Sequence, residues 1–189
     1  MLTSQEEYNK FFKDQLEFLK TLDKRYLKSI RLYTEESFIL LNSKLASLEI
    51  PISTRLPDGV LPDKLQEIYD DLIYIFQNIP PISKKIKVYR GIGDVEDDPK
   101  NIIKNLTRRF VSTSTQEEVV EDFIVGDCCK LIIYIPKGSK VIPASPYSQS
   151  PEELEVLLPP GGEYKVSKKE QDENDVTLYN INYKESQII

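Results

Sequence analysis

Residues 150–162 read Ser-Pro-Glu-Glu-Leu-Glu-Val-Leu-Leu-Pro-Pro-Gly-Gly, an acidic entrance that runs into a strongly apolar strand signal. The Pro-Pro-Gly-Gly sequence predicts a turn that ends this strand. Alternate side chains of a strand share a face, so Glu153 and Glu155 are expected on the same face. The opposite face, predicted to be core, carries Leu154, Val156 and Leu158. Taken alone, the stretch favours a solvated strand edge, because charged pairs mostly lie on the surface.

Two further motifs lie upstream on predicted strands. They are Tyr89-Arg90-Gly91, and Phe110-Val111-Ser112-Thr113-Ser114. Each is unremarkable alone: Arg90 could pair with a surface carboxylate, and Ser-Thr-Ser is an ordinary β-prone run. Three motifs in order, each on a predicted strand, form a much more specific signal than any one of them. In this order they resemble the mono-ADP-ribosyltransferase family, in its bacterial-toxin-like class.

The resemblance implies an α+β fold in which two mainly antiparallel sheets enclose an NAD cleft. The hydrophobic pattern agrees, because residues 1–81 have helical periodicity and residues 82–189 read mostly as short strands. We expect one ADP-ribosyltransferase domain over residues 1–189, with a helical N-terminal part and a β-rich catalytic core. The boundary falls after Pro80-Pro81, which ends the last predicted helix of the first part.

The resemblance also implies the chemistry. NAD would be the substrate, without a metal, and ADP-ribose would pass to a protein. Glu155 matches the catalytic glutamate, which faces the positive charge on the ribose, and Glu153 matches the residue that engages the acceptor. In this family a glutamate at the position of Glu153 goes with arginine as the acceptor. Two carboxylates this close should raise one pKa, which would help Glu153 accept a proton.

The remaining site residues are also implied by the resemblance. Arg90 would contact the NAD phosphates, and Gly91 would let the backbone approach the ligand. Ser112 would hydrogen-bond Glu155 and fix its side chain, while Thr113 and Ser114 would support the strand.

Two aromatic residues complete the expected site. Phe123, on a predicted helix from residue 116 to 123, would lie beside nicotinamide, although a core-facing position is about as well supported. Tyr147 lies in the loop before Glu153, which recognises the target in this family.

The chain departs from the family pattern at two positions. Gly91 stands where some toxins carry a second arginine, and Gly126 stands where some relatives have another phosphate-binding arginine. NAD is therefore expected to bind more weakly, or through other groups. Asn42, in a predicted helix after Thr34, is expected to be a buried amide that joins two helices.

The composition excludes several functions. The 189-residue chain has no histidine, which excludes a His-based triad and a His-ligated metal site. Its net charge is −6, and it has no basic stretch interleaved with aromatics, so neither nucleic acid nor an anionic membrane is an expected partner. The sequence contains no signal-peptide pattern and no membrane-spanning run. Together with two adjacent cysteines, this favours a reducing, cytoplasmic location, in the producing cell or in a host cell.

Three functions fit these observations. The first is transfer of ADP-ribose to a protein arginine. An NAD glycohydrolase would use the same site with water as acceptor, and a catalytically silent binding module would use only the fold. The intact pair Glu153 and Glu155 argues against the silent module, because such a module does not need both carboxylates.

Overall fold

The computed structural model describes residues 2–47, 61–92, 99–121, 129–172 and 176–185. Helices dominate the first part of the chain, and a π-helical turn, η1 (Tyr33–Ser37), interrupts them. These helices are α1 (Gln5–Phe11), α2 (Lys13–Thr21), α3 (Lys24–Leu32), α4 (Phe38–Ser47) and α5 (Asp63–Asn78). Within the described ranges no helix is both long and apolar enough to cross a membrane.

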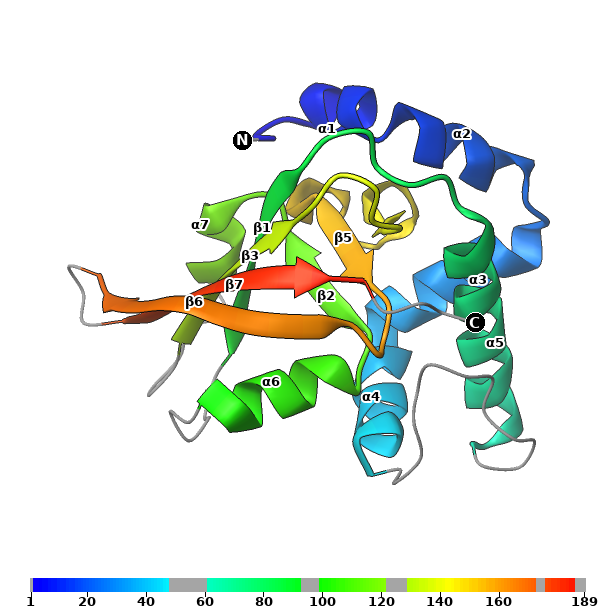
Figure 1. Ribbon diagram of the computed structural model, residues 1–189. Helices are drawn as coiled ribbons and strands as arrows, with labels where there is room; N and C mark the ends of the chain where they lie inside the picture. Colours follow the sequence, from blue (N-terminus) through cyan, green and yellow to red (C-terminus); the bar gives the residue numbers. More distant parts are fainter. Residues whose placement is uncertain (1, 48–60, 93–98, 122–128, 173–175, 186–189) are drawn as a thin grey trace.

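The second part of the chain is built on strands. These are β1 (Ile86–Ile92), β2 (Val111–Ser114), β3 (Cys129–Ile135), β4 (Ile142–Pro143), β5 (Glu155–Leu158), β6 (Glu163–Gln171) and β7 (Thr177–Lys184). The connections contain α6 (Pro99–Thr107), α7 (Glu117–Glu121) and the 3₁₀ turns η2 (Ser145–Tyr147) and η3 (Pro151–Glu153). Figure 1 shows α7 beside β1 and α6 beneath β6.

The predicted mixed fold is confirmed, but the two-sheet arrangement is not. The seven strands of the described residues belong to one sheet, in the order β4-β5-β2-β1-β3-β7-β6. Among these strands only the pair β3 and β7 runs parallel, so the sheet is mainly antiparallel. Tyr89 pairs with Ser114, and this β1–β2 contact joins β4-β5-β2 to β1-β3-β7-β6.

Phe110 marks the place where the helices meet the sheet. Its side chain is 1% exposed, and its ring lies 5.5 Å from that of Tyr33, 5.7 Å from Tyr69 and 6.1 Å from Phe76. The side-chain amide of Asn42 donates to the Phe110 carbonyl at 3.2 Å and accepts from its N–H at 3.1 Å. Asn42 is therefore a buried amide, as expected, but it ties α4 to the residue before β2 as well as bonding the Tyr33 hydroxyl at 3.0 Å.

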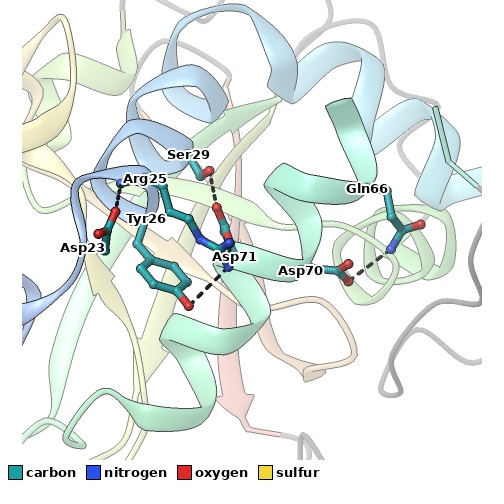
Figure 2. Close-up of polar contacts among 7 residues, drawn as sticks. All are labelled: Asp23, Arg25, Tyr26, Ser29, Gln66, Asp70 and Asp71. Atoms are coloured by element: carbon teal, nitrogen blue, oxygen red, sulfur yellow. Dashed lines mark hydrogen bonds and ion pairs between the residues drawn. The ribbon is translucent and has the colours of Figure 1, made fainter. Parts of the chain in front are cut away.

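A buried carboxylate joins α3 to α5 (Figure 2). Asp71 is 2% exposed and accepts a hydrogen bond from Ser29 Oγ at 2.8 Å. The guanidinium of Arg25 lies 3.0 Å from the same carboxylate, and the backbone N–H of Arg25 donates to Asp23 Oδ1, the helix N-cap, at 2.9 Å. Because an unpaired buried charge is costly, these contacts fix the two helices in register.

The structure has a helix that the sequence does not predict, α6 over residues 99–107. Pro99 occupies its first position, where a missing N–H costs nothing. Its buried side chains are Ile102 and Leu106, spaced four apart. The predicted strand that carries the Ser-Thr-Ser motif begins at Val111, so Phe110 lies just before it.

Candidate functional site

A cavity of about 290 Å³ opens where β1 and β2 meet. It brings together residues from segments that are far apart in the sequence. The predicted site residues that line it are Arg90, Gly91, Ser112, Thr113, Ser114, Glu153 and Glu155.

Glu155 lies at the centre of the polar contacts. It is 6% exposed, and its Oε1 accepts a hydrogen bond from Ser112 Oγ at 2.5 Å. In the β2–β5 pairing Ser114 lies opposite Glu155, and Ser112 lies opposite Leu157. Ser112 and Glu155 are therefore diagonal neighbours on one face of the sheet, which is within side-chain reach. The hydrogen bond expected between them is present.

The other two hydroxyl groups of the Ser-Thr-Ser run also bond to the glutamate segment. Thr113 Oγ1 donates to the Val156 carbonyl at 2.7 Å, and Ser114 Oγ donates to the Glu153 carbonyl at 2.6 Å. A strand of ordinary β-prone residues has no need for three such bonds. These bonds fix the short strand β2 against the segment that carries both carboxylates.

The expectation that Glu153 and Glu155 share one face of a strand is wrong. Glu153 belongs to the 3₁₀ turn η3, and β5 begins only at Glu155. Leu154 between them has a φ of 47°, the left-handed conformation that non-glycine residues rarely adopt. The sharp turn at Leu154, and not strand alternation, is what brings both carboxylates to the wall of the cavity.

Burial sets the protonation of this pair. It raises the pKa of Glu155 to about 7, and the nearby Glu153 adds to the rise, whereas the Ser112 hydrogen bond and the charge of Arg90 oppose it. The pKa of Glu153 is also raised, first by burial and then by Glu152. Repulsion from Glu153, which we expected to raise one of the two pKa values, does add to the rise in the pKa of Glu155 but is secondary to burial.

Arg90 faces the same cavity from β1. Its Nη1 donates to the Ser112 carbonyl at 2.6 Å, so it also supports the strand that holds Glu155. Burial lowers the pKa of the Arg90 guanidinium, although arginine stays charged at any ordinary pH. Among the described residues no carboxylate forms an ion pair with it. Its charge is therefore available for an anion.

Of the remaining predicted residues, only Tyr147 is described by the structure, and it does not line the cavity. Tyr147 lies in η2, is half-buried and packs against the hydrophobic core. Phe123 and Gly126 lie outside the described residues.

Several cavity residues had no predicted role in the site. Tyr33, Thr34, Phe38 and Asn42 line it from η1 and α4, and Tyr89 from β1. The remaining two, Val119 and Val120, come from α7. The spacing of Phe38 from the buried Leu41 and Leu45 is typical of a core stripe, yet Phe38 is 38% exposed and lines the cavity.

The arrangement can stabilise a positive charge next to a bound anion. The Glu155 carboxylate, buried and held by the Ser112 hydroxyl, is suited to stabilising the positive charge. The Arg90 guanidinium is suited to binding the anion. No group of three or more potential metal ligands occurs in the described part of the chain.

Comparison with known proteins agrees with this geometry. The sequence profile of the ADP-ribosyltransferase exoenzyme family matches residues 6–188. None of the curated proteins matches the chain by sequence.

Similar solved structures share the fold at low sequence identity. Plx2a, an ADP-ribosyltransferase toxin from Paenibacillus larvae, is 19% identical with a TM-score of 0.73, covering 95% of this chain and 96% of its own. The C3 exoenzyme of Clostridium limosum is 18% identical with a TM-score of 0.73, covering 97% and 96%. C3stau2 from S. aureus, solved with NAD, is 17% identical with a TM-score of 0.72, covering 97% of each chain.

The family profile spans almost the whole chain, and the fold and the motif geometry agree with it. The chain therefore belongs to the ADP-ribosyltransferase exoenzyme family.

Proposed function

We propose that this protein is an NAD-dependent mono-ADP-ribosyltransferase that modifies arginine in a target protein and releases nicotinamide. The observation that carries the proposal is the buried Glu155 carboxylate, held by Ser112 at 2.5 Å in a cavity that it shares with Arg90. The Glu155 carboxylate would stabilise a developing cation, and the Arg90 guanidinium would bind a phosphate.

NAD as the substrate is supported from two directions. The relative C3stau2, which has nearly the same length and fold, was solved with NAD. In this chain the Arg90 guanidinium has no carboxylate partner among the described residues, and a diphosphate would supply the missing charge. Tyr33 and Asn42 also line the cavity, and there the Tyr33 hydroxyl and the Asn42 amide are hydrogen-bonded to the Phe110 carbonyl.

The reaction begins when the bond between the nicotinamide nitrogen and ribose C1′ breaks. Nicotinamide leaves with the electron pair, and positive charge spreads over the ribose as in glycoside hydrolysis. The Glu155 carboxylate stabilises that charge, and the buried position strengthens the interaction because little water screens it. A guanidinium nitrogen of the acceptor then bonds to C1′, and its proton passes to Glu153.

Arginine as the acceptor is supported by Glu153. Its pKa is raised by burial, so its carboxylate is a better base than an exposed glutamate. The Ser114 hydrogen bond to its carbonyl, at 2.6 Å, holds its backbone at the cavity wall.

Incubation with labelled NAD and a lysate, followed by detection of labelled protein and free nicotinamide, tests the proposal. Label on arginine of a protein supports it. Free nicotinamide without protein label supports the glycohydrolase instead, and the absence of both products supports the silent module.

The Glu155→Gln variant should lose NAD cleavage and transfer together. The amide keeps the shape of the side chain and removes the charge, which should lower kcat roughly 100- to 1,000-fold. Nicotinamide release measures this loss. Glu163→Gln makes the same chemical change at an exposed position outside the cavity and should keep full activity. If Glu155→Gln keeps most of its NAD cleavage, Glu155 is not the catalytic group.

The Glu153→Gln variant should separate the two half-reactions. Transfer to a small guanidine acceptor such as agmatine should fall strongly, because only that step needs a base at this position. NAD cleavage with water as acceptor should persist, because Glu155 still faces the ribose. The ratio of the two products measures the split. Parallel loss of both activities would show that Glu153 serves NAD binding or folding.

The Arg90→Ala variant should weaken NAD binding. A charge-assisted hydrogen bond contributes about 1.5–3 kcal/mol, which corresponds to a loss of roughly ten- to a hundredfold. Arg90→Lys should recover part of it, because an ammonium lacks the bidentate fork. Calorimetric titration of NAD gives the affinities, with Lys104→Ala as a control that removes one exposed positive charge. Unchanged affinity in Arg90→Ala would mean that other groups hold the phosphates.

The catalytic carboxylate should also destabilise the unliganded protein at high pH. Its pKa is raised from 4.5 to about 7, so the folded state binds the proton more tightly than the unfolded chain. The contribution of this proton to the free energy of unfolding is fully present below about pH 4.5 and is lost as the pH rises through about 7. At 1.36 kcal/mol per pKa unit the loss is about 3 kcal/mol.

Urea unfolding of the unmodified protein and of Glu155→Gln at pH 5 and pH 8 measures this effect. The variant cannot titrate here, so its free energy of unfolding should exceed that of the unmodified protein by more at pH 8 than at pH 5. A difference that stays constant between the two pH values would contradict the raised pKa.

A further inference from the structure

Residues 2–8 bond to three segments that are distant in sequence and lie next to the site. We call the segment Leu2–Tyr8 the N-terminal strap. Two of these segments bond to it through side chains: Thr115 Oγ1 donates to the Leu2 carbonyl at 3.0 Å, Gln116 Nε2 to the Thr3 carbonyl at 3.1 Å, and Ser145 Oγ to Gln5 Oε1 at 3.2 Å. Figure 1 shows α1 above the start of β5. The strap therefore spans the end of the Ser-Thr-Ser strand and the loop that leads to the glutamates.

The last residue of the strap reaches the catalytic strand itself. Tyr8 is completely buried, and its hydroxyl donates to the backbone carbonyl of Glu155. The same carbonyl accepts from the N–H of Ala144 at 3.0 Å. The Tyr8 ring packs against Phe12 at 4.7 Å, which fixes the direction of the hydroxyl. Burial raises the pKa of Tyr8 well above its usual value, so the phenol remains a donor at neutral pH.

Glu155 needs this support because its backbone follows an unfavourable turn. Leu154 holds a φ of 47°, a conformation that persists only when its surroundings enforce it. Relaxation at Leu154 would rotate the next peptide and carry the Glu155 side chain away from Ser112. Tyr8 and Ala144 hold the carbonyl of the peptide that follows, between Glu155 and Val156, while Ser112 holds the carboxylate, so the Glu155 residue is fixed on both sides of its Cα.

We propose that Tyr8 is a positioning residue for the reaction, acting through the backbone of Glu155. The proposal rests on the proposed function, because Glu155 is the group that faces the ribose. Tyr8 is not among the described residues that line the cavity, so it would not contact NAD bound there. A change at Tyr8 should therefore affect the chemical step and leave NAD binding intact.

The Tyr8→Phe variant tests this proposal, because it keeps the ring and removes only the donor. Nicotinamide release should show a kcat reduced roughly 10- to 100-fold, as expected for a misplaced catalytic group. The KM for NAD should be unchanged. Calorimetric titration should give the same Kd for NAD and one site per chain. The measured number of sites also gives the concentration of folded molecules, by which kcat is normalised.

Tyr183→Phe is the matched control. The Tyr183 hydroxyl is buried and has no hydrogen-bond partner among the described residues, so its removal should leave kcat unchanged. An unchanged kcat in Tyr8→Phe would overturn the proposal. So would a loss that disappears once activity is divided by the number of NAD-binding molecules, because Tyr8 would then only stabilise the fold. No nicotinamide release from the unmodified protein would overturn the proposed function, and with it the role of Tyr8.

Discussion

The structure depends on keeping one carboxylate out of water. Glu155 lies at the start of β5, 6% exposed, among side chains that form the core on both faces of the strand. A charge in such a place is unfavourable, and burial therefore raises the pKa of Glu155 to about 7. The hydroxyl of Ser112 and the charge of Arg90 reduce the cost without removing it. The same desolvation that weakens the fold makes the carboxylate effective against a cation.

The geometry of the site follows from strand register. Ser112 and Ser114 face the same side of the sheet as Glu155, and Thr113 faces the other. A slip of one residue between β2 and β5 would turn both serines away from the carboxylate. Three side-chain hydrogen bonds, one from each residue of the run, oppose that slip. Arg90, which bonds to the Ser112 carbonyl, couples the register to the neighbouring strand β1.

Much of this could be predicted from sequence, because strand alternation and motif order are local signals. They placed Arg90, Ser112 and Glu155 each on a strand, and the family resemblance predicted that the three share one site; the structure brings all three to one cavity. The local signals failed at Glu153, because nothing in the Glu-Leu-Glu run indicates the left-handed turn at Leu154. They also give no sign of the role of Tyr8, whose apolar spacing is typical of a core position. Its hydrogen bond to residue 155 depends on tertiary packing, which no local pattern encodes.

The same long-range contact constrains the order of events during synthesis. Tyr8 and Glu155 are separated by 147 residues, so the ribosome makes α1 long before its acceptor exists. At the usual speed of translation that interval is on the order of ten seconds. Until then the phenol lacks its acceptor, and β2 has only β1 to pair with. The Glu155 carboxylate is thus brought to the cavity only after most of the chain has left the ribosome.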